Sequence, residues 1–121
     1  MAKRTIETFY WLPYCTTCQK AEAYLKDKGI KIKTYVDVKE DGVNKITVKK
    51  LCKLADGADN VFSKRAMKYR SWGLNEKDLS EDEMIDYMVQ EYTFIKRPTL
   101  VTNDDQILSG FSKKRYDAMF D

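Results

Sequence analysis

The 121-residue chain contains no histidine and only three cysteines, Cys15, Cys18 and Cys52. A structural zinc site needs four nitrogen or sulfur ligands, and this inventory cannot supply them, so we expect no bound metal. An odd, small number of cysteines is also unlike the disulfide framework of a secreted protein. Any disulfide between Cys15 and Cys18 is therefore expected to be transient, which is typical of a cytoplasmic protein.

Long apolar runs are missing as well. No stretch approaches the roughly 20 residues that span a membrane, and residues 1–4 lead directly into a strand pattern, which leaves no room for a signal peptide. Hydrophobic residues make up 43% and charged residues 34% of the chain, as in an ordinary globular protein. We expect one domain over residues 1–121, cytoplasmic and without membrane contact.

The net charge of +3 is small but unevenly distributed. Acidic residues gather between Glu76 and Glu91, and basic residues gather over 45–53, 64–70 and 113–115. Such runs are most simply solvated helix faces, and a surface for a partner or an anion is the alternative. No nucleic-acid motif accompanies them, so direct binding of nucleic acid is not expected.

The chain does have a C-x-x-C pair, Cys15 and Cys18, placed between a strand pattern over 6–12 and a helical pattern from Thr17. A helix N-terminus carries about half a positive charge and stabilises a thiolate, which is the nucleophilic form of cysteine. This spacing at a strand-to-helix junction indicates a thioredoxin-like redox site, with Cys15 as the more reactive thiol. Two inert buried cysteines are the alternative.

The remaining patterns complete an α/β protein. Strands are predicted over 30–38, 99–102 and 106–109, and helices over 43–56, 63–71, after a capping box at Ser80, and after Ser112. Cys52 falls on the apolar stripe of the second helix, which favours a core position over a resolving thiol. The order predicts a thioredoxin-like fold: a four-stranded mixed sheet with helices on both faces and a helical insertion over 43–92.

Six segments of the sequence carry a resemblance to a known family. The chain resembles the arsenate reductase and Spx family of thioredoxin-like proteins along nearly its whole length. The segments that carry this resemblance are 13–21 (PYCTTCQKA), 56–57 (DG), 63–65 (SKR), 69–74, 94–101 (FIKRPTLV) and 110–112 (GFS).

The glutaredoxin-linked arsenate reductases of this family imply an enzyme. The cysteine that matches Cys15 attacks the oxyanion, and glutathione and glutaredoxin complete the reduction. The expected anion- and substrate-binding residues are Arg97, Arg65, Thr16, Thr17 and Pro98, with Pro98 following a cis bond. No cofactor is expected to be bound. Glutathione, glutaredoxin or thioredoxin would be the reductant, Cys18 could resolve the intermediate, and the substrate would be a small anion or thiol.

Two positions depart from the reductase pattern. The family's two further arginines match Ser63 and Gly110 in this sequence, and Arg65 lies close by without matching either. A dianion held by one guanidinium instead of three loses charge-assisted hydrogen bonds of about 1.5–3 kcal/mol each. This departure disfavours arsenate itself as the substrate.

The Spx regulators imply a different function. Cys18, the Asp56-Gly57 pair and Arg65 resemble the corresponding Spx residues. In Spx a C-x-x-C disulfide switches binding to the C-terminal domain of the RNA polymerase α-subunit, and the glycine matching Gly57 lies in the contact surface. The alternative to the enzyme is therefore a redox-switched regulator that binds this domain without turnover.

Overall fold

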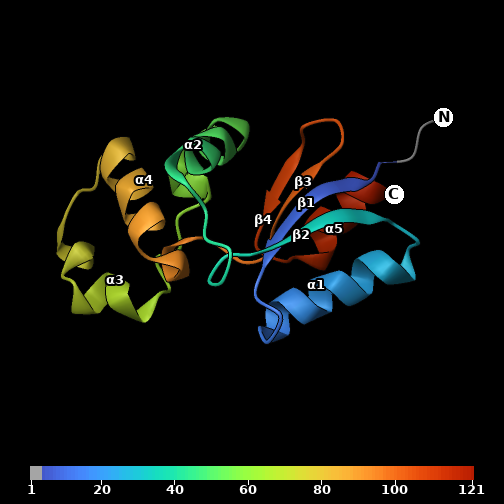
Figure 1. Ribbon diagram of the computed structural model, residues 1–121, viewed down its shortest axis with the longest axis horizontal. Coiled ribbons are helices and arrows are strands. Elements are labelled where there is room, and N and C mark those ends of the chain that lie inside the picture. The colour runs from blue at the N-terminus through green and yellow to red at the C-terminus, as the bar shows by residue number, and fades with distance from the viewer. Residues whose placement is uncertain (1–3) are drawn as a thin grey trace. The chain divides into compact units, whose positions relative to one another are not determined.

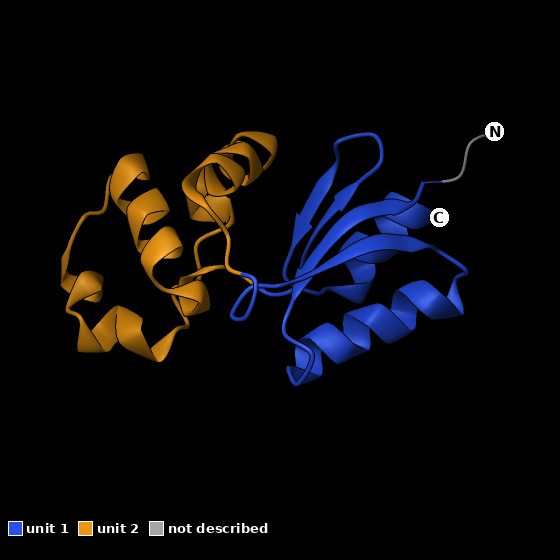
Figure 2. Cartoon of the chain, in the orientation of Figure 1, with its two compact units in different colours: residues 1–41, 97–121 blue, residues 42–96 orange. Residues whose placement is uncertain are grey.

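The computed structural model describes residues 4–121. Within this range a four-stranded sheet and five α-helices divide between two compact units (Figures 1 and 2). Unit 1 takes the chain up to Asp41 and from Arg97 onward, and unit 2 takes Gly42–Lys96. The expectation of no signal peptide rests on residues 1–3, which lie outside the described residues. The single domain over 1–121 and the insertion over 43–92 stay predictions.

Unit 1 contains the mixed sheet that the sequence predicted. Its strands are β1 (Ile6–Trp11), β2 (Ile32–Asp37), β3 (Thr99–Thr102) and β4 (Ile107–Ser109), in the order β2-β1-β3-β4. β1 runs parallel to β2, and β3 is antiparallel to both β1 and β4. Helix α1 (Thr16–Asp27) joins the two parallel strands, so the predicted strand–helix–strand unit is confirmed.

Two helices, α1 and α5 (Lys113–Phe120), cover the same face of this sheet (Figure 1). The Tyr24 ring of α1 meets the Tyr116 ring of α5 edge-on, with 5.4 Å between centroids. The backbone N–H of Arg115 donates to the Ser112 hydroxyl, so Ser112 caps the helix that the sequence predicts after it. Side chains from both helices and the sheet form one core, made of Ile6, Phe9, Ala21, Leu25, Leu100 and Tyr116.

Unit 2 is helical. Its α-helices are α2 (Lys45–Leu54), α3 (Met67–Ser71) and α4 (Glu81–Gln90), and its 3₁₀ turns are Ala58–Asn60, Leu74–Glu76 and Tyr92–Phe94. The predicted capping box is confirmed at α4, because the Glu83 N–H donates to the Ser80 hydroxyl and the Ser80 N–H donates back to the Glu83 carboxylate. The Phe62 and Phe94 rings stack at 5.2 Å in the core.

The helix predicted over 63–71 is only partly correct, because α3 begins at Met67. Just before it, Phe62 forms an isolated antiparallel bridge with Ile95, and the Ser63 N–H donates to the Phe94 carbonyl at 2.7 Å. The bridge to Ile95 holds Phe62 in an extended conformation, and the α-helix forms only after a turn. Long-range pairing therefore overrides the local helical pattern at 63–66.

The prediction that the chain does not span a membrane agrees with the helices of residues 4–121. None of them is long and apolar enough to cross a bilayer.

Candidate functional site

Cys15 lies at the N-terminus of α1, as the sequence predicted. It is the residue that precedes the first helical turn, with an extended backbone, and its side chain caps none of the helix N–H groups. Its own N–H donates to the Leu12 carbonyl at 3.1 Å, and its carbonyl accepts from the Gln19 N–H at 2.9 Å. These bonds fix the backbone of the strand-to-helix turn, and the Cys15 thiol stays partly exposed.

Cys18 lies one turn further along α1 and is fully buried. Burial raises the pKa of its thiol to about 12, and a hydrogen bond with the Cys15 side chain acts in the same direction. A hydrogen bond from the Leu12 backbone and the positive charge of Arg97 lower the pKa but do not offset the burial. At neutral pH the Cys18 thiol is therefore protonated, and Cys15 is the accessible member of the pair.

The two thiols are hydrogen-bonded but not covalently joined. Both cysteines are free, and their sulfur atoms are not at disulfide distance. The structure thus represents the reduced dithiol. The redox-active disulfide expected from the C-x-x-C spacing stays a prediction.

Arg97 and Pro98 lead into β3 in the same unit. The Arg97–Pro98 bond is cis, as expected from the resemblance. Pro98 is buried and Arg97 is half-buried, and the guanidinium lies close enough to Cys18 to act on its thiol electrostatically. The structure therefore brings this cation to the dithiol, while its role in binding an anion stays a prediction.

The other predicted site residues fall in two places. Thr16 and Thr17 form the exposed first turn of α1, beside Cys15 in unit 1. Arg65 is an exposed residue of the segment before α3, and Gly57 lies after α2, so both belong to unit 2. The binding roles assigned to these four residues are untested.

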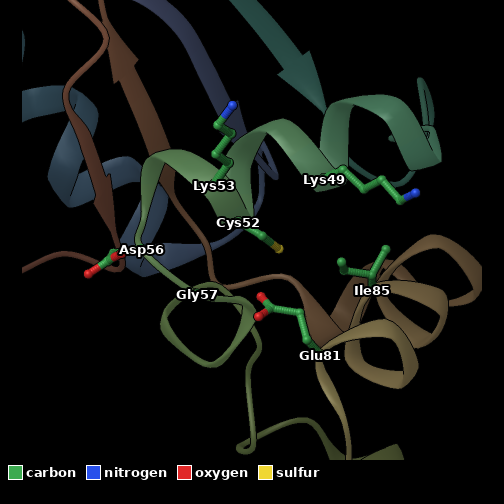
Figure 3. Close-up of a pocket in the computed structure, with 7 residues that line it drawn as sticks. All are labelled: Lys49, Cys52, Lys53, Asp56, Gly57, Glu81 and Ile85. Carbon is green, nitrogen blue, oxygen red and sulfur yellow. The ribbon is translucent and has the colours of Figure 1, made fainter.

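Unit 2 has an open pocket of about 430 Å³ between α2 and α4. Figure 3 shows the Cys52 sulfur pointing from α2 toward Glu81 and Ile85 of α4. The Glu81 carboxylate accepts a hydrogen bond from the Ala58 N–H at 2.5 Å. The complete lining is Lys49, Cys52, Lys53, Asp56, Gly57, Glu81 and Ile85.

Cys52 belongs to the core of unit 2, which confirms the prediction made from its position on the helical stripe. Only 3% of the residue is exposed, and it packs in one cluster with Val48 and Ile85. Burial raises the pKa of its thiol to about 11, and the neighbouring Glu81 carboxylate contributes to the rise. Cys52 is thus a poor nucleophile at neutral pH.

Sequence reasoning missed the pocket and its residue Glu81. The spacing of Lys49, Cys52 and Lys53 puts these residues on one face of α2, so the sequence contained a signal for the side of the pocket that α2 forms. Glu81 lies in the acidic stretch between Glu76 and Glu91, which the sequence alone presents as a solvated helix face. Its contact with Ala58, 23 residues earlier in the chain, could not be inferred locally. Within residues 4–121, no three histidine, cysteine or acidic side chains converge on a point that could hold a metal ion.

A mixed four-stranded sheet with a C-x-x-C pair at the start of its first helix defines the chain as a thioredoxin-like protein. The model of the ArsC family matches residues 10–119, and the chain belongs to this family. It is 34% identical to the uncharacterised protein YusI of Bacillus subtilis, over 91% of this chain and 94% of YusI. It is 24% identical to the regulatory protein MgsR of the same organism, over 84% of this chain and 80% of MgsR.

Solved structures have the same fold. An ArsC family related protein from Bacteroides fragilis superposes with a TM-score of 0.81 at 24% identity, covering 98% of each chain. The arsenate reductase from Vibrio cholerae superposes with a TM-score of 0.74 at 20% identity, covering 89% of this chain and 91% of the other. At these identities the likeness establishes the fold, and the relatives include both reductases and regulators.

Proposed function

We propose that this chain is a thiol-dependent oxidoreductase in which Cys15 is the nucleophile and Cys18 the resolving thiol. The observation that carries the proposal is the hydrogen-bonded pair at the start of α1, with Cys15 partly exposed and Cys18 buried behind it. The Cys15 thiol is accessible to a substrate, whereas the Cys18 thiol is shielded from solvent and can react only with Cys15. This division of roles suits a two-step exchange.

The reaction of the pair with a disulfide substrate proceeds as follows. The Cys15 thiolate attacks one sulfur of the substrate, the substrate S–S bond breaks, and the first thiol leaves with the electron pair and takes up a proton. Cys18 then loses its proton and attacks the Cys15 sulfur, which releases the second thiol and leaves a Cys15–Cys18 disulfide. Glutathione, glutaredoxin or thioredoxin returns the pair to the dithiol.

Arg97 supports a preference for anionic substrates. Its guanidinium can donate two parallel hydrogen bonds to a carboxylate or an oxyanion, and it already lies near the dithiol. Only one of the three arginines of the arsenate reductases has a match in this sequence. One guanidinium is enough to pair with one carboxylate of glutathione, so a mixed disulfide of glutathione fits the site better than arsenate.

A coupled assay tests the proposed activity. The protein is mixed with glutathione, glutaredoxin, glutathione reductase and NADPH, and oxidation of NADPH is followed after addition of a glutathione mixed disulfide or of arsenate. We expect turnover of the mixed disulfide, above the rate without the protein, and little turnover of arsenate. No acceleration with either substrate would refute the oxidoreductase.

Replacing Arg97 with lysine should weaken anion binding and leave the chemical step nearly intact. Lysine keeps the charge but not the two-pronged geometry, so KM for the mixed disulfide should rise roughly tenfold while kcat changes little. Arg115→Lys is the matched control, because Arg115 is an exposed arginine of the same unit that donates to the Ser109 carbonyl. Equal KM values for native and Arg97→Lys proteins would contradict the proposed role of Arg97 in binding the anionic substrate.

The second candidate is a redox-switched regulator that binds the C-terminal domain of the RNA polymerase α-subunit. The observation that favours it is the open pocket of unit 2, whose lining includes Gly57 together with Lys49 and Lys53 of α2 (Figure 3). The regulators among the relatives match over most of this chain. In this reading, formation of the Cys15–Cys18 disulfide would change the affinity for the polymerase domain.

A pull-down distinguishes the regulator from the enzyme. If the regulator is correct, the purified polymerase domain should bind the oxidised protein more tightly than the reduced protein, and Lys53→Glu should weaken binding about tenfold by reversing a charge at the pocket. Lys50→Glu is the control, since Lys50 is exposed on α2 but does not line the pocket. Equal binding of both redox forms would eliminate the switch.

A further inference from the structure

The chain passes from β1 into α1 through a tight turn over residues 12–15. The Cys15 N–H donates to the Leu12 carbonyl at 3.1 Å, which is the hydrogen bond that closes a four-residue β-turn. Pro13 occupies the second position, where its fixed φ is favoured. The turn ends on the nucleophile of the proposed reaction, so its conformation determines where the Cys15 sulfur lies.

The type of this turn follows from Tyr14, its third residue. Within residues 4–121, the residues other than glycine that have a positive φ are Asp56 and Asp105, so φ of Tyr14 is negative. A type II turn requires a positive φ at the third position, whereas a type I turn has a negative φ there. The turn is therefore of type I. A change to type II would flip the peptide that joins Pro13 to Tyr14.

One side chain of α1 binds this peptide. The Gln19 amide donates from Nε2 to the Pro13 carbonyl at 2.8 Å, six residues back along the chain. Helical side chains lean toward the N-terminus of their helix, so Gln19, whose own N–H donates to the Cys15 carbonyl, can reach back over the turn. Because the Pro13 carbonyl belongs to the peptide that would flip, this hydrogen bond opposes a change of turn type.

Packing does little to hold the turn. Pro13 is exposed, and Tyr14 keeps 63% of its surface accessible. A peptide at the surface can exchange a hydrogen bond within the protein for one to water, so each such bond shifts the conformational balance only modestly. Among the described residues, the hydrogen bonds donated by Cys15 and Gln19 therefore decide how well the turn is ordered.

We propose that Gln19 is a positioning residue, which holds the peptide between Pro13 and Tyr14 so that the Cys15 sulfur stays aligned with Cys18. This inference rests on the proposed function, in which Cys18 resolves the adduct on Cys15. Cys18 is fully buried on the inner face of α1 and is held by the core, whereas Cys15 is carried by the turn. How often the two sulfur atoms are aligned therefore depends on the order of the turn.

The resolving step is more sensitive to the turn than the first attack is. An external disulfide approaches the partly exposed Cys15 thiol from solvent and can adapt to its orientation. In the resolving step Cys18 loses its proton to solvent, its thiolate attacks the Cys15 sulfur, and the bound thiol leaves with the electron pair. This attack is intramolecular and depends on alignment, so a mobile turn slows it while the first attack keeps its rate.

Reaction with 5,5′-dithiobis(2-nitrobenzoate), followed by stopped-flow absorbance, measures the two steps separately. The first coloured thiolate leaves when Cys15 attacks the reagent, and the second leaves when Cys18 attacks the adduct. The test variant is Gln19→Met in a Cys52→Ala background, because methionine keeps the length of the side chain but cannot donate a hydrogen bond. We expect the first phase to stay within about twofold and the second phase to slow roughly fivefold.

Gln90→Met is the matched control, because Gln90 is an exposed glutamine at the end of α4 in unit 2. It should change neither phase. Gln19→Met should unfold at nearly the native Tm, since substitutions at exposed positions change stability little. An unchanged second phase in Gln19→Met, or equal slowing of both phases, would refute the positioning role.

A second background tests whether Gln19 acts through the turn. Glycine accepts a positive φ without penalty, so Tyr14→Gly makes the type II turn accessible. In this background Gln19→Met should slow the second phase by at least about tenfold, because the hydrogen bond then decides between two accessible turn types. The same factor with and without Tyr14→Gly would mean that Gln19 does not act on this peptide.

The turn can also be observed without any thiol reaction, which separates this inference from the proposed function. In Cys15→Ser protein, a strong nuclear Overhauser effect between the amide protons of residues 14 and 15 marks type I, and one between Pro13 Hα and the next amide proton marks type II. We expect Tyr14→Gly to keep the first pattern and its combination with Gln19→Met to shift toward the second.

The two outcomes of this measurement have different meanings. An unchanged pattern in the double variant would overturn the role of the Gln19 hydrogen bond. A shifted pattern, together with absence of the second phase in native protein, would refute the resolving role of Cys18 alone.

Discussion

Replacing Cys15 with serine should abolish the exchange reaction, lowering kcat/KM for a glutathione mixed disulfide by on the order of a thousandfold or more. A serine hydroxyl at this position is isosteric but is not ionised at neutral pH, and a thiolate is the attacking species. Cys18 cannot take over, because it is fully buried and its pKa is raised to about 12 by that burial. The coupled NADPH assay measures this loss directly.

Two further cysteine variants locate the step that each thiol performs. Cys18→Ser should still form the adduct on Cys15, seen as a mass increase confined to the peptide that holds Cys15, but should not form the internal disulfide. Cys52→Ala is the matched control and should retain the native rate, since Cys52 lies in the core of unit 2. Retention of the native rate by Cys15→Ser, or its loss in Cys52→Ala, would contradict the assignment of Cys15.

The local parts of the dithiol site could be predicted from the sequence. Cys15, Cys18 and the start of α1 lie within one short segment, and the change from strand to helix pattern marks the junction at which they stand. The same holds for the Ser80 capping box, whose two hydrogen bonds join residues three positions apart. These features depend on neighbours along the chain, so their prediction needed no knowledge of the fold.

The parts that could not be predicted depend on contacts between distant segments. The pKa of Cys18 is set mainly by its burial, and Arg97, whose charge lowers that pKa, comes from a distant segment of the chain. A hydropathy pattern shows which face of a helix is buried, but it does not show which charged group from another segment lies near a buried thiol. The missing helical turn at 63–66 has the same origin, since Phe62 is held in an extended bridge with Ile95.

The burial of Cys18 has a consequence for the reaction cycle. A thiol that is protonated at neutral pH attacks slowly, so the adduct on Cys15 should persist long enough for glutathione or glutaredoxin to compete with Cys18. Arg97 and the Leu12 backbone, which lower the pKa of Cys18, favour internal resolution. In the proposed reaction, the balance between these routes would decide whether the chain cycles through an internal disulfide or through a mixed disulfide.

Replacing Phe94 with alanine should lower the free energy of unfolding by about 3–5 kcal/mol. Phe94 is fully buried in unit 2, where its ring stacks on Phe62 at 5.2 Å and meets Trp72 at 5.5 Å and Tyr87 at 6.0 Å. Truncation leaves a cavity among three rings and removes aromatic contacts worth about 0.5–1.5 kcal/mol each. The loss is a large fraction of the roughly 5–15 kcal/mol that stabilises a typical domain.

Urea unfolding, followed by tryptophan fluorescence, measures this loss as a decrease in the urea concentration at the midpoint. The decrease should be about 2 M, because the free energy of unfolding falls by roughly 1–3 kcal/mol per molar urea. Val89→Ala is the matched control, because Val89 lies on α4 of the same unit with 40% of its surface exposed. Its effect should stay within about 0.5 kcal/mol. Phe94→Leu should fall between the two, since leucine refills part of the cavity. A loss below about 1 kcal/mol for Phe94→Ala would mean that the four rings do not form the centre of the unit 2 core.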